Sequence, residues 1–363
     1  MLRKNLFSLI LVGGVAMAHP HIANACTGIT LTPKDKSVVV ARTIEWSGSE
    51  MKSDYVIVPQ GYTQKSFVPG GEKDGLEFSA RYGYVGLAVV EPEYIVEGLN
   101  EAGLSAGLFY FPGYGQYEAY DPADNATTIS DFQLVSWMLS RFSTIDQIQD
   151  AIRDVRVVGI DPRASTVHWR IADMTGRQVV LEIVDGVPHF YENTLGVLTN
   201  APGFEWQMTN LNNYVNLTPG TAGPTDIRNL RMKSFGGGSG MLGLPGDVTP
   251  PSRFVRAAFY AATAIPQNTA YGAVMQAFHI LNNFDVPVGT QYPIDQVPTP
   301  MPSATQFTSA TDMTNQILYY RTMYNSVIRA IDLTKINFSD VKYQVHPMDA
   351  IREQTVINIQ PDA

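Results

Sequence analysis

The chain has 363 residues, 45% of them hydrophobic, and its 34 acidic and 25 basic residues give a net charge of −9. An acidic chain without a run of lysines or arginines is a poor ligand for nucleic acid or an anionic membrane, and neither is expected as a partner. The single cysteine excludes a disulfide within the chain, so a hydrophobic core must supply the stability.

The first 25 residues are predicted to be a signal peptide that is removed on export. Two basic residues precede an apolar stretch, residues 6–18, that is too short to span a bilayer, and Ala23-Asn24-Ala25 forms a small-x-small cleavage site. No later apolar stretch has the length of a membrane span. We therefore expect a periplasmic or secreted protein in which residues 26–363 form a single domain, with 23 basic and 34 acidic residues and a net charge of −11.

Cleavage after Ala25 would make Cys26 the first residue of the mature chain. Its thiol would then be a nucleophile beside a free α-amino group, whose pKa of about 7.7–8.0 suits a base that takes the thiol proton and later protonates a leaving amine. This arrangement predicts an N-terminal-nucleophile hydrolase. Two alternatives stay open: Cys26 is an ordinary buried cysteine, or it is the lipid-attachment site of an exported binding protein, although Ala23 stands where lipidated chains usually have leucine.

The first part of the mature chain is expected to form β-strands, because apolar and β-branched residues recur between turn signals. The expected strands are residues 27–32, 37–46, 55–59, 84–90 and 95–110, the last with a turn at 100–103. A helical region follows over residues 127–152, with a second helix beginning at 145. The strands that come next are residues 166–173, 178–184 and 187–192.

Two helices are expected in the second half of the chain, over residues 252–264 and 271–283. Before them, the glycine- and proline-rich residues 234–251 contain apolar anchors and are interpreted as an ordered loop near a functional site. After them, residues 306–356 are interpreted as strands, among them a hairpin of 316–323 and 326–333. Separate runs of strands and helices predict an α+β fold with antiparallel sheets flanked by helices.

The histidine and cysteine spacing indicates no metal site. Beyond the predicted signal peptide the histidines are scattered, and no HExxH or CxxC motif is present; they are His168, His189, His279 and His346. The sequence therefore predicts neither a metal nor a cofactor.

Several segments, taken together in chain order, have a recognisable pattern. They are Cys26-Thr27-Gly28 and residues 41–46, 98–105, 107–113, 198–202, 207–214 and 243–247 with 251–256. Together they resemble the choloylglycine hydrolase family, which includes conjugated bile acid hydrolases and penicillin V acylases. The resemblance implies the four-layer αββα fold of N-terminal-nucleophile hydrolases. It also implies hydrolysis of a linear non-peptide amide through a thioester acyl-enzyme, without a cofactor, and a homo-oligomer, commonly a tetramer.

The resemblance implies catalytic roles for Cys26, Arg42, Glu45, Asn200 and Arg253. Arg42 would lie beside the thiol and lower its pKa; the alternative on the residues alone is an edge-strand arginine that faces water. Glu45 stands where the family usually has aspartate, which binds the α-amino group of the cysteine. The carboxylate charge is kept, but one more methylene moves it by about a bond length.

Asn200 and Arg253 each have a structural alternative as well. In the family the side-chain amide of Asn200 donates to the oxyanion, whereas the local sequence also fits a turn-forming asparagine before Pro202. Arg253 opens a predicted helix and opposes the helix dipole there, so its side chain is expected to reach a partner. The resemblance places it near the nucleophile, and the alternative is a solvated helix residue.

Tyr110 and Trp46 bear on the substrate, which is expected to be a small-molecule amide. The backbone N–H of Tyr110 would be the second oxyanion donor, and its position is typically asparagine in bile salt hydrolases and tyrosine in penicillin V acylases. Either aromatic residue can instead belong to the core. Three substrate classes stay open: phenoxyacetyl-type penicillins, N-acyl homoserine lactones, and glycine- or taurine-conjugated bile acids. The two aromatic residues favour the first two.

Overall fold

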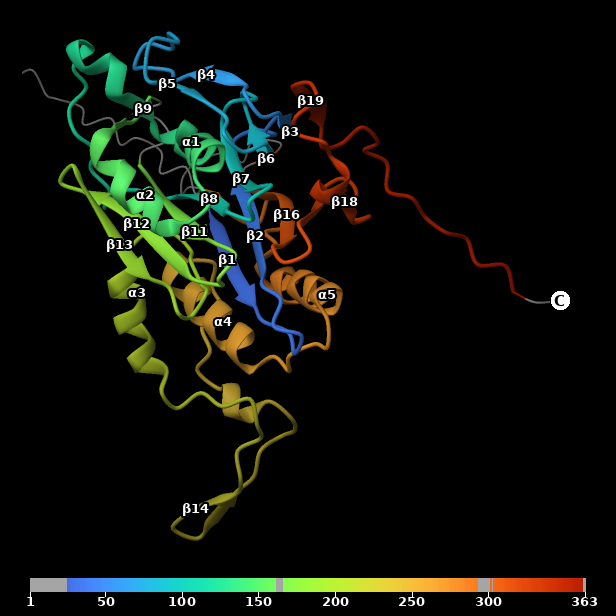
Figure 1. Cartoon of the computed structure of the whole chain (residues 1–363). Coiled ribbons are helices and arrows are strands. Elements are labelled where there is room, and N and C mark those ends of the chain that lie inside the picture. The colour runs from blue at the N-terminus through green and yellow to red at the C-terminus, as the bar shows by residue number, and fades with distance from the viewer. Residues whose placement is uncertain (1–24, 161–165, 293–300, 302, 362–363) are drawn as a thin grey trace, which may run out of the picture.

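The computed structural model describes residues 25–160, 166–292, 301 and 303–361. Two antiparallel sheets lie face to face, and helices cover the outer face of each sheet (Figure 1). This arrangement confirms the α+β class and the four αββα layers. The predicted signal peptide, apart from Ala25, lies outside the described residues.

The five-stranded sheet contains the first described strand. In spatial order it consists of β1 (Cys26–Leu31), β2 (Val39–Trp46), β16 (Ala304–Asp312), β17 (Ile317–Thr322) and β18 (Arg329–Asp332). Side chains alternate along β2: Val40 and Ile44 join the core between the sheets, whereas Val39 and Ala41 join the core under the helices. The strands predicted over residues 27–32 and 37–46 are confirmed as the antiparallel pair β1 and β2, and β2 lies inside the sheet between β1 and β16.

The eight-stranded sheet has the spatial order β13-β12-β11-β8-β7-β6-β3-β19. In chain order its strands are β3 (Ser53–Val58), β6 (Tyr84–Val89), β7 (Ile95–Asn100), β8 (Ser105–Tyr110), β11 (Val167–Ala172), β12 (Gln178–Val184), β13 (Val187–Glu192) and β19 (Gln344–Pro347). The predicted turn between β7 and β8 is closed by Asn100, whose Oδ1 accepts from the N–H groups of Ala102 (3.1 Å) and Leu104 (2.9 Å). Short pairs outside this sheet are β4 (Thr63–Lys65) with β5 (Glu77–Ser79), β9 (Thr128–Ser130) with β10 (Arg156–Val158), and β14 (Thr225–Ile227) with β15 (Leu230–Met232).

The helices bury their apolar faces on the two sheets. Helix α1 (Leu134–Arg141) packs on β6, β7 and β8, and α2 (Ile145–Ala151) follows it. On the opposite side, α4 (Pro250–Thr263) packs on β1, and α5 (Ala270–Leu281) packs on β1, β2 and β16. The short helix α3 (Phe204–Asn210) contacts α4.

Local sequence explains where these helices begin. Thr144 and Thr269 accept hydrogen bonds from backbone N–H groups in the first turns of α2 and α5. Helix α4 begins at Pro250, two residues earlier than predicted, because proline fits the first turn of a helix, where N–H groups have no intrahelical partner. The helix predicted from residue 127 was wrong at its start: it begins at Leu134, since β9 and a 3-10 turn precede it.

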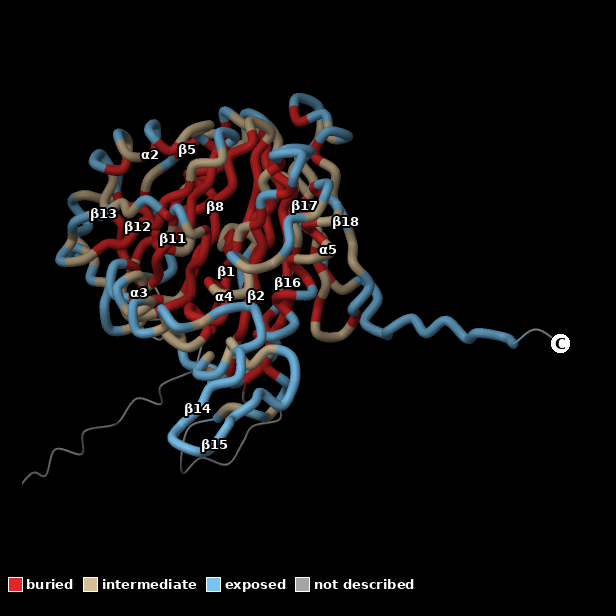
Figure 2. The backbone as a smooth tube through the Cα atoms, turned by 90° about the horizontal axis from the view of Figure 1, so that it is seen from below, coloured by how far each residue is buried: buried red, intermediate tan, exposed pale blue. Residues whose placement is uncertain are grey.

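Residues 215–248 form an arm that leaves the four layers and contains β14 and β15 (Figure 1). None of its residues is buried, and the tube around β14 and β15 has the colour of exposed residues (Figure 2). Its exposed residues include the apolar Phe235 and Leu242. The prediction that residues 234–251 lie near a functional site stays a prediction. The end of that segment is attached to α4. There, Arg256 of α4 donates from Nη1 to the carbonyls of Pro245 (2.7 Å) and Asp247 (2.6 Å).

The C-terminal strands are shorter than predicted. The second strand of the predicted hairpin begins at Arg329 rather than at residue 326, and it pairs with β17. Strand β19 pairs with β3, and no further strand is present up to residue 361 in the described part of the chain. Residues 351–361 are exposed and extend away from the sheets (Figure 1).

We expect Ile29→Ala to lower the free energy of unfolding by about 2–5 kcal/mol, because this side chain is fully buried between β1 and the helices and its removal leaves a cavity. Equilibrium urea unfolding measures the change. Val215→Ala, on the exposed arm, is the control and should change the free energy by less than about 0.5 kcal/mol. Equal stability of the Ile29 variant and the parent would contradict the packing described.

Candidate active site

Cys26 begins β1, and only 6% of its surface is exposed. Strand pairing sets Cys26 opposite Ile44, which belongs to the core between the sheets, so the thiol faces the second sheet. A cavity of about 50 Å³, here called the Cys26 pocket, lies at this point and is lined mainly by apolar side chains. Its lining includes Trp46, Met51, Tyr110 and Phe132.

Asn200 reaches Cys26 because the segment before it is attached to the edge of β1. The N–H of Gly28 donates to the carbonyl of Leu198 (2.7 Å), and the N–H of Leu198 donates to the carbonyl of Gly28 (3.1 Å). Asn200 Oδ1 then accepts from the Cys26 N–H (2.9 Å), and Nδ2 donates to the Tyr110 carbonyl (2.7 Å). Asn200 is 1% exposed, and its side chain joins the start of β1 to the end of β8 instead of closing a local turn before Pro202.

A buried histidine–glutamate pair supports the same segment. His168 lies 3.1 Å from the Thr199 carbonyl through Nε2 and 3.1 Å from Glu182 Oε1 through Nδ1. The His168 ring therefore bridges the Thr199 carbonyl and the Glu182 carboxyl group. Glu182 Oε1 also accepts from the N–H of Phe204 (2.9 Å), at the start of α3. The pair thereby fixes the chain on both sides of Asn200.

Arg253 lies in the first turn of α4 and is almost fully buried. Its Nη1 donates to the Cys26 carbonyl and to Thr27 Oγ1 (2.9 Å), and its Nη2 donates to Asn200 Oδ1 (2.6 Å). Its Nε donates to the Val248 carbonyl (2.9 Å). Burial lowers the pKa of the guanidinium, and the nearby Glu45 and Cys26 oppose that shift. The alternative of a solvated helix residue is therefore wrong.

Glu45 lies on β2 beside the bond that joins Ala25 to Cys26. Its N–H donates to the Ala25 carbonyl (2.9 Å), and its Oε1 accepts from Thr305 Oγ1 (3.1 Å). Its Oε2 is buried and has no hydrogen-bond partner among the described residues. Burial raises the pKa of Glu45 to about 7, with Arg253 the largest opposing influence. The carboxyl group is thus a buried acceptor site with one oxygen still to be satisfied.

Arg42 is completely buried between the two sheets, opposite Gly28 on β1. Its guanidinium lies 3.8 Å from the centre of the Phe109 ring, and Nη1 donates to the carbonyls of Val96 (2.9 Å) and Leu108. It also lines the Cys26 pocket. Since β2 is an inner strand, the alternative of an edge-strand arginine facing water is wrong.

Tyr110 and Trp46 both line the Cys26 pocket and are half-buried. Tyr110 ends β8, next to the Asn200 side chain. Trp46 ends β2 and donates from Nε1 to Ser49 Oγ (3.3 Å). Both aromatic side chains therefore line the pocket, and Trp46 also packs against the core between the sheets. The seven residues selected from the sequence all lie in this pocket or contact Cys26; their catalytic roles stay predictions.

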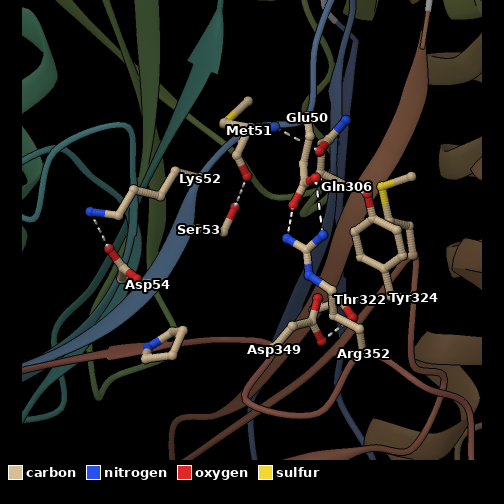
Figure 3. A pocket seen from close by; sticks show the side chains of 12 residues that line it. Glu50, Met51, Lys52, Ser53, Asp54, Gln306, Thr322, Tyr324, Asp349 and Arg352 are labelled. Atoms are coloured by element: carbon tan, nitrogen blue, oxygen red, sulfur yellow. Dashed lines mark hydrogen bonds and ion pairs between the residues drawn. The ribbon is translucent and has the colours of Figure 1, made fainter. Parts of the chain in front are cut away.

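A larger cavity of about 330 Å³ is shown in Figure 3, and Met51 lines both this cavity and the Cys26 pocket. Its charged side chains already pair with one another: Lys52 lies 3.2 Å from Asp54, and Arg352 donates to Glu50. It contains no thiol, since Cys26 is the only cysteine of the chain. The thiol of the chain therefore lines the smaller, apolar Cys26 pocket.

Two further features are absent from the described residues, a metal cluster and a membrane-spanning helix. Within the described ranges, no group of three or more histidine, cysteine, aspartate or glutamate side chains is arranged to hold a metal ion. No helix among the described residues is both long and apolar enough to cross a membrane.

Sequence reasoning missed four ionisable residues that the fold places near the site: Glu97, Arg170, His168 and Glu182. Each is buried, and each lies within a strand of mostly apolar residues. A charged residue inside such a strand is costly unless it is paired, and this is the signal that singled out Arg42. The same criterion, applied to every strand, would have found these residues but not their partners.

The four-layer fold, with a thiol on the first strand and a buried amide and guanidinium around it, defines the class of N-terminal-nucleophile hydrolases. Residues 26–346 match the family model of linear amide C–N hydrolases, choloylglycine hydrolase family. The chain therefore belongs to the choloylglycine hydrolase family, and it is a linear amide C–N hydrolase of the bile salt hydrolase and penicillin V acylase type.

Individual relatives extend over most of the chain. A bile salt hydrolase/transferase of Clostridium perfringens (strain 13 / Type A) is 30% identical over 318 residues, which are 86% of this chain and 93% of that protein. A solved structure of a variant of conjugated bile acid hydrolase from Clostridium perfringens is similar with a TM-score of 0.79 and 27% identity, covering 92% of this chain and 100% of that one. A penicillin V acylase of Pectobacterium atrosepticum is 24% identical, covering 88% of this chain and 83% of that protein.

We expect Arg253→Lys to lower kcat/KM for amide hydrolysis by about 10²-fold or more, because one ammonium group does not reach acceptors on three chain segments and Asn200 loses its anchor. Steady-state kinetics measures the loss. Arg231→Lys, on the exposed arm, is the matched control and should retain the parent activity. Full activity of the Arg253 variant would show that the guanidinium contacts are dispensable.

We expect the stability of the chain that retains Ala25 to fall as the pH rises from about 4.5 to about 7. The folded state holds the proton on Glu45 up to about pH 7, whereas the unfolded chain releases it near the ordinary value of 4.5. The free energy of unfolding is therefore highest below that window and loses up to about 3 kcal/mol across it. Urea unfolding at pH 5 and pH 8 measures the drop, and Glu45→Gln should remove this part of it. An equal drop in both chains would contradict the burial argument.

Proposed function

We propose that removal of residues 1–25 on export leaves a mature enzyme whose Cys26 cleaves a linear amide outside the cytoplasm. The contact set that supports this proposal best is the one around Cys26 itself, in which Asn200 and Arg253 bind its backbone and its thiol faces the pocket. The chain has a single cysteine, so its thiol cannot be used in a disulfide within the chain and is free to act as the nucleophile.

The reaction follows from the groups present once the α-amine is free. The amine takes the thiol proton, and the Cys26 thiolate attacks the carbonyl carbon of the substrate. The oxyanion that forms is held by the Asn200 amide and the Tyr110 backbone. When the C–N bond breaks, the ammonium gives its proton to the leaving amine, and a thioester joins the acyl group to Cys26. Water, deprotonated by the same amine, then attacks the thioester and releases the acid.

Glu45, Arg42 and Arg253 provide the charges that this sequence needs. Glu45 Oε2, buried and unsatisfied, is a site for the α-ammonium, and the extra methylene relative to aspartate is accommodated by the hydrogen bond from Thr305. The positive charge of Arg42 favours the thiolate. Arg253 holds the Asn200 amide in register with Cys26.

The alternative of a lipid-anchored binding protein has less support. A lipidated cysteine must stand at an accessible chain end, whereas the Cys26 side chain is buried on a strand paired with β2. A lipid anchor would also leave the buried side chains around it without a function; these are Arg42, Asn200 and Arg253. Burying the two arginines costs free energy, which favours an interpretation in which they have a role.

We further propose an acyl group that is flat or aromatic, as in phenoxyacetyl penicillins, or a slender acyl chain, as in N-acyl homoserine lactones. The Cys26 pocket is small, and Tyr110, Trp46 and Phe132 offer aromatic faces for stacking. Conjugated bile acids are the second candidate, because the relative with 30% identity is a bile salt hydrolase/transferase.

We also propose that the mature chain forms a homo-oligomer, a tetramer as the family resemblance implies. The arm of residues 215–248 supports an assembly of copies of this chain. It exposes Ile227, Leu230, Phe235 and Leu242, and exposed apolar side chains on a projecting segment are typical of surfaces that a partner covers.

The test of the proposed function is the intact mass of the purified exported protein, with and without iodoacetamide, combined with assays on the three amide classes. We expect a chain that begins at Cys26, a single rapid alkylation, and loss of all amide hydrolysis after it. We expect penicillin V or an N-acyl homoserine lactone to have a higher kcat/KM than glycocholate.

Three outcomes would contradict the proposal in different ways. A chain that begins elsewhere, or one with a diacylglyceryl adduct, would exclude the N-terminal thiol mechanism. Hydrolysis that survives complete alkylation would exclude Cys26 as the nucleophile. Hydrolysis of glycocholate and of neither other amide would be consistent with the mechanism, but it would show that the substrates are conjugated bile acids and not penicillins or N-acyl homoserine lactones.

A further inference from the structure

We infer that Glu97 and Arg170 set the charge that acts on the Cys26 thiolate: Arg170 neutralises Glu97, and the positive charge of Arg42 is thereby left to the thiolate. The inference rests on the proposed function, because it concerns the same nucleophile. It concerns two buried ions that neither touch Cys26 nor line its pocket.

The two side chains meet above a glycine. Glu97 on β7 is paired with Gly107 on β8, and Gly107 is paired with Arg170 on β11, so the three positions form one row across the sheet. Arg170 donates from Nη2 to Glu97 Oε1, and both residues are 1% exposed. A β-carbon at position 107 would stand 2.4 Å from Glu97 Oε2. Only glycine at this position leaves room for the pair.

Arg42 approaches this pair from the other sheet. Its Nη1 lies 3.8 Å from Glu97 Oε2, a looser contact than the hydrogen bond that Arg170 makes to Oε1. Its Nη2 is buried and has no hydrogen-bond partner among the described residues. The ring of Phe109 and the carbonyl of Val96 hold the guanidinium in place. Glu97 is therefore neutralised mainly by Arg170, and Arg42 retains most of its charge on the side of the Cys26 pocket.

The net charge of Arg42, Arg170 and Glu97 affects the pKa of the Cys26 thiol. Two arginines and one glutamate leave the cluster with one net positive charge, and the other charged groups around Cys26 are Glu45 on β2 and Arg253 on α4. A positive charge near a thiol favours the thiolate. Without Arg170, Glu97 would pair with Arg42 alone and cancel that charge. Without Glu97, both arginines would act on the thiol unopposed.

The test is the pKa of the Cys26 thiol, measured as the pH dependence of its alkylation by iodoacetamide in the purified processed protein. We expect Arg170→Met to raise this pKa and Glu97→Gln to lower it, each by about one pH unit, as expected for one charge within about 10 Å in a partly buried setting. The double variant has the parent's net charge in the cluster, and its thiol pKa should return toward the parent value.

Shifts of the thiol pKa in opposite directions distinguish this electrostatic role from a purely structural one. Loss of packing alone would not make the direction of the shift depend on which charge is removed. Unchanged thiol pKa values in the variants, or shifts of the same sign in both single variants, would overturn the inference. Gly107→Ala keeps all three charges and displaces the Glu97 carboxylate, so it decides the question where the single variants do not fold. A Gly107 variant with the parent's thiol pKa would count against the inference.

Asp173→Asn is the control for loss of a buried carboxylate. Asp173 accepts from the N–H groups of Ile145 (3.3 Å) and Thr175 (3.0 Å) in a turn away from the pocket, so this variant should lose stability without a change in thiol pKa. The alkylation assay needs no substrate. If the processed parent cleaves none of the three amide classes, the proposed function fails, while the titration still decides the inference.

Discussion

The Arg253 guanidinium is the interaction on which the geometry of the site depends. It donates to the Cys26 carbonyl, to Asn200 Oδ1 and to the Val248 carbonyl, so three chain segments far apart in sequence converge on one planar group. A buried guanidinium is tolerated only where its N–H groups find acceptors, and each segment is therefore held in place by the other two. The packing of α4 on β1 makes this meeting possible, which is how the outer helical layer takes part in a site that opens between the sheets.

Close approach of the two sheets is the second constraint, and glycine at position 28 permits it. A β-carbon there would stand 2.9 Å from Phe109 Cζ, and Phe109 has little freedom to move because the Arg42 guanidinium packs on its ring. The same glycine bonds to Leu198 through its backbone and so attaches the Asn200 segment to β1. One small residue thus allows the sheets to meet next to the nucleophile and aligns the amide that faces it.

Much of this arrangement was predictable, and the parts that were not share a physical cause. The strands and the two long helices follow from alternation, caps and prolines, all of which are local. Helix α3 was missed, since Gly203 gives it no side-chain cap and its residues are largely polar. For the site, Cys26 is identified by its place after a cleavage motif, and Arg42 by a charge inside an apolar strand. Glu97 and Arg170 have that second signal as well, but their pairing depends on the strand order β11-β8-β7, which no local pattern specifies.

The buried carboxyl group of Glu45 gives the proposed removal of the signal peptide a consequence for stability. While Ala25 is joined to Cys26, the Glu45 Oε2 atom is buried without a partner and burial raises the pKa of the carboxyl to about 7. Release of the α-amine would put a cation beside this oxygen, since the Glu45 N–H already contacts the Ala25 carbonyl. The buried carboxylate would then destabilise the shorter chain less than the longer one, because an ion pair offsets part of the cost of desolvation. Cleavage would thus create the base of the reaction and, at the same step, the partner that the carboxyl group lacks.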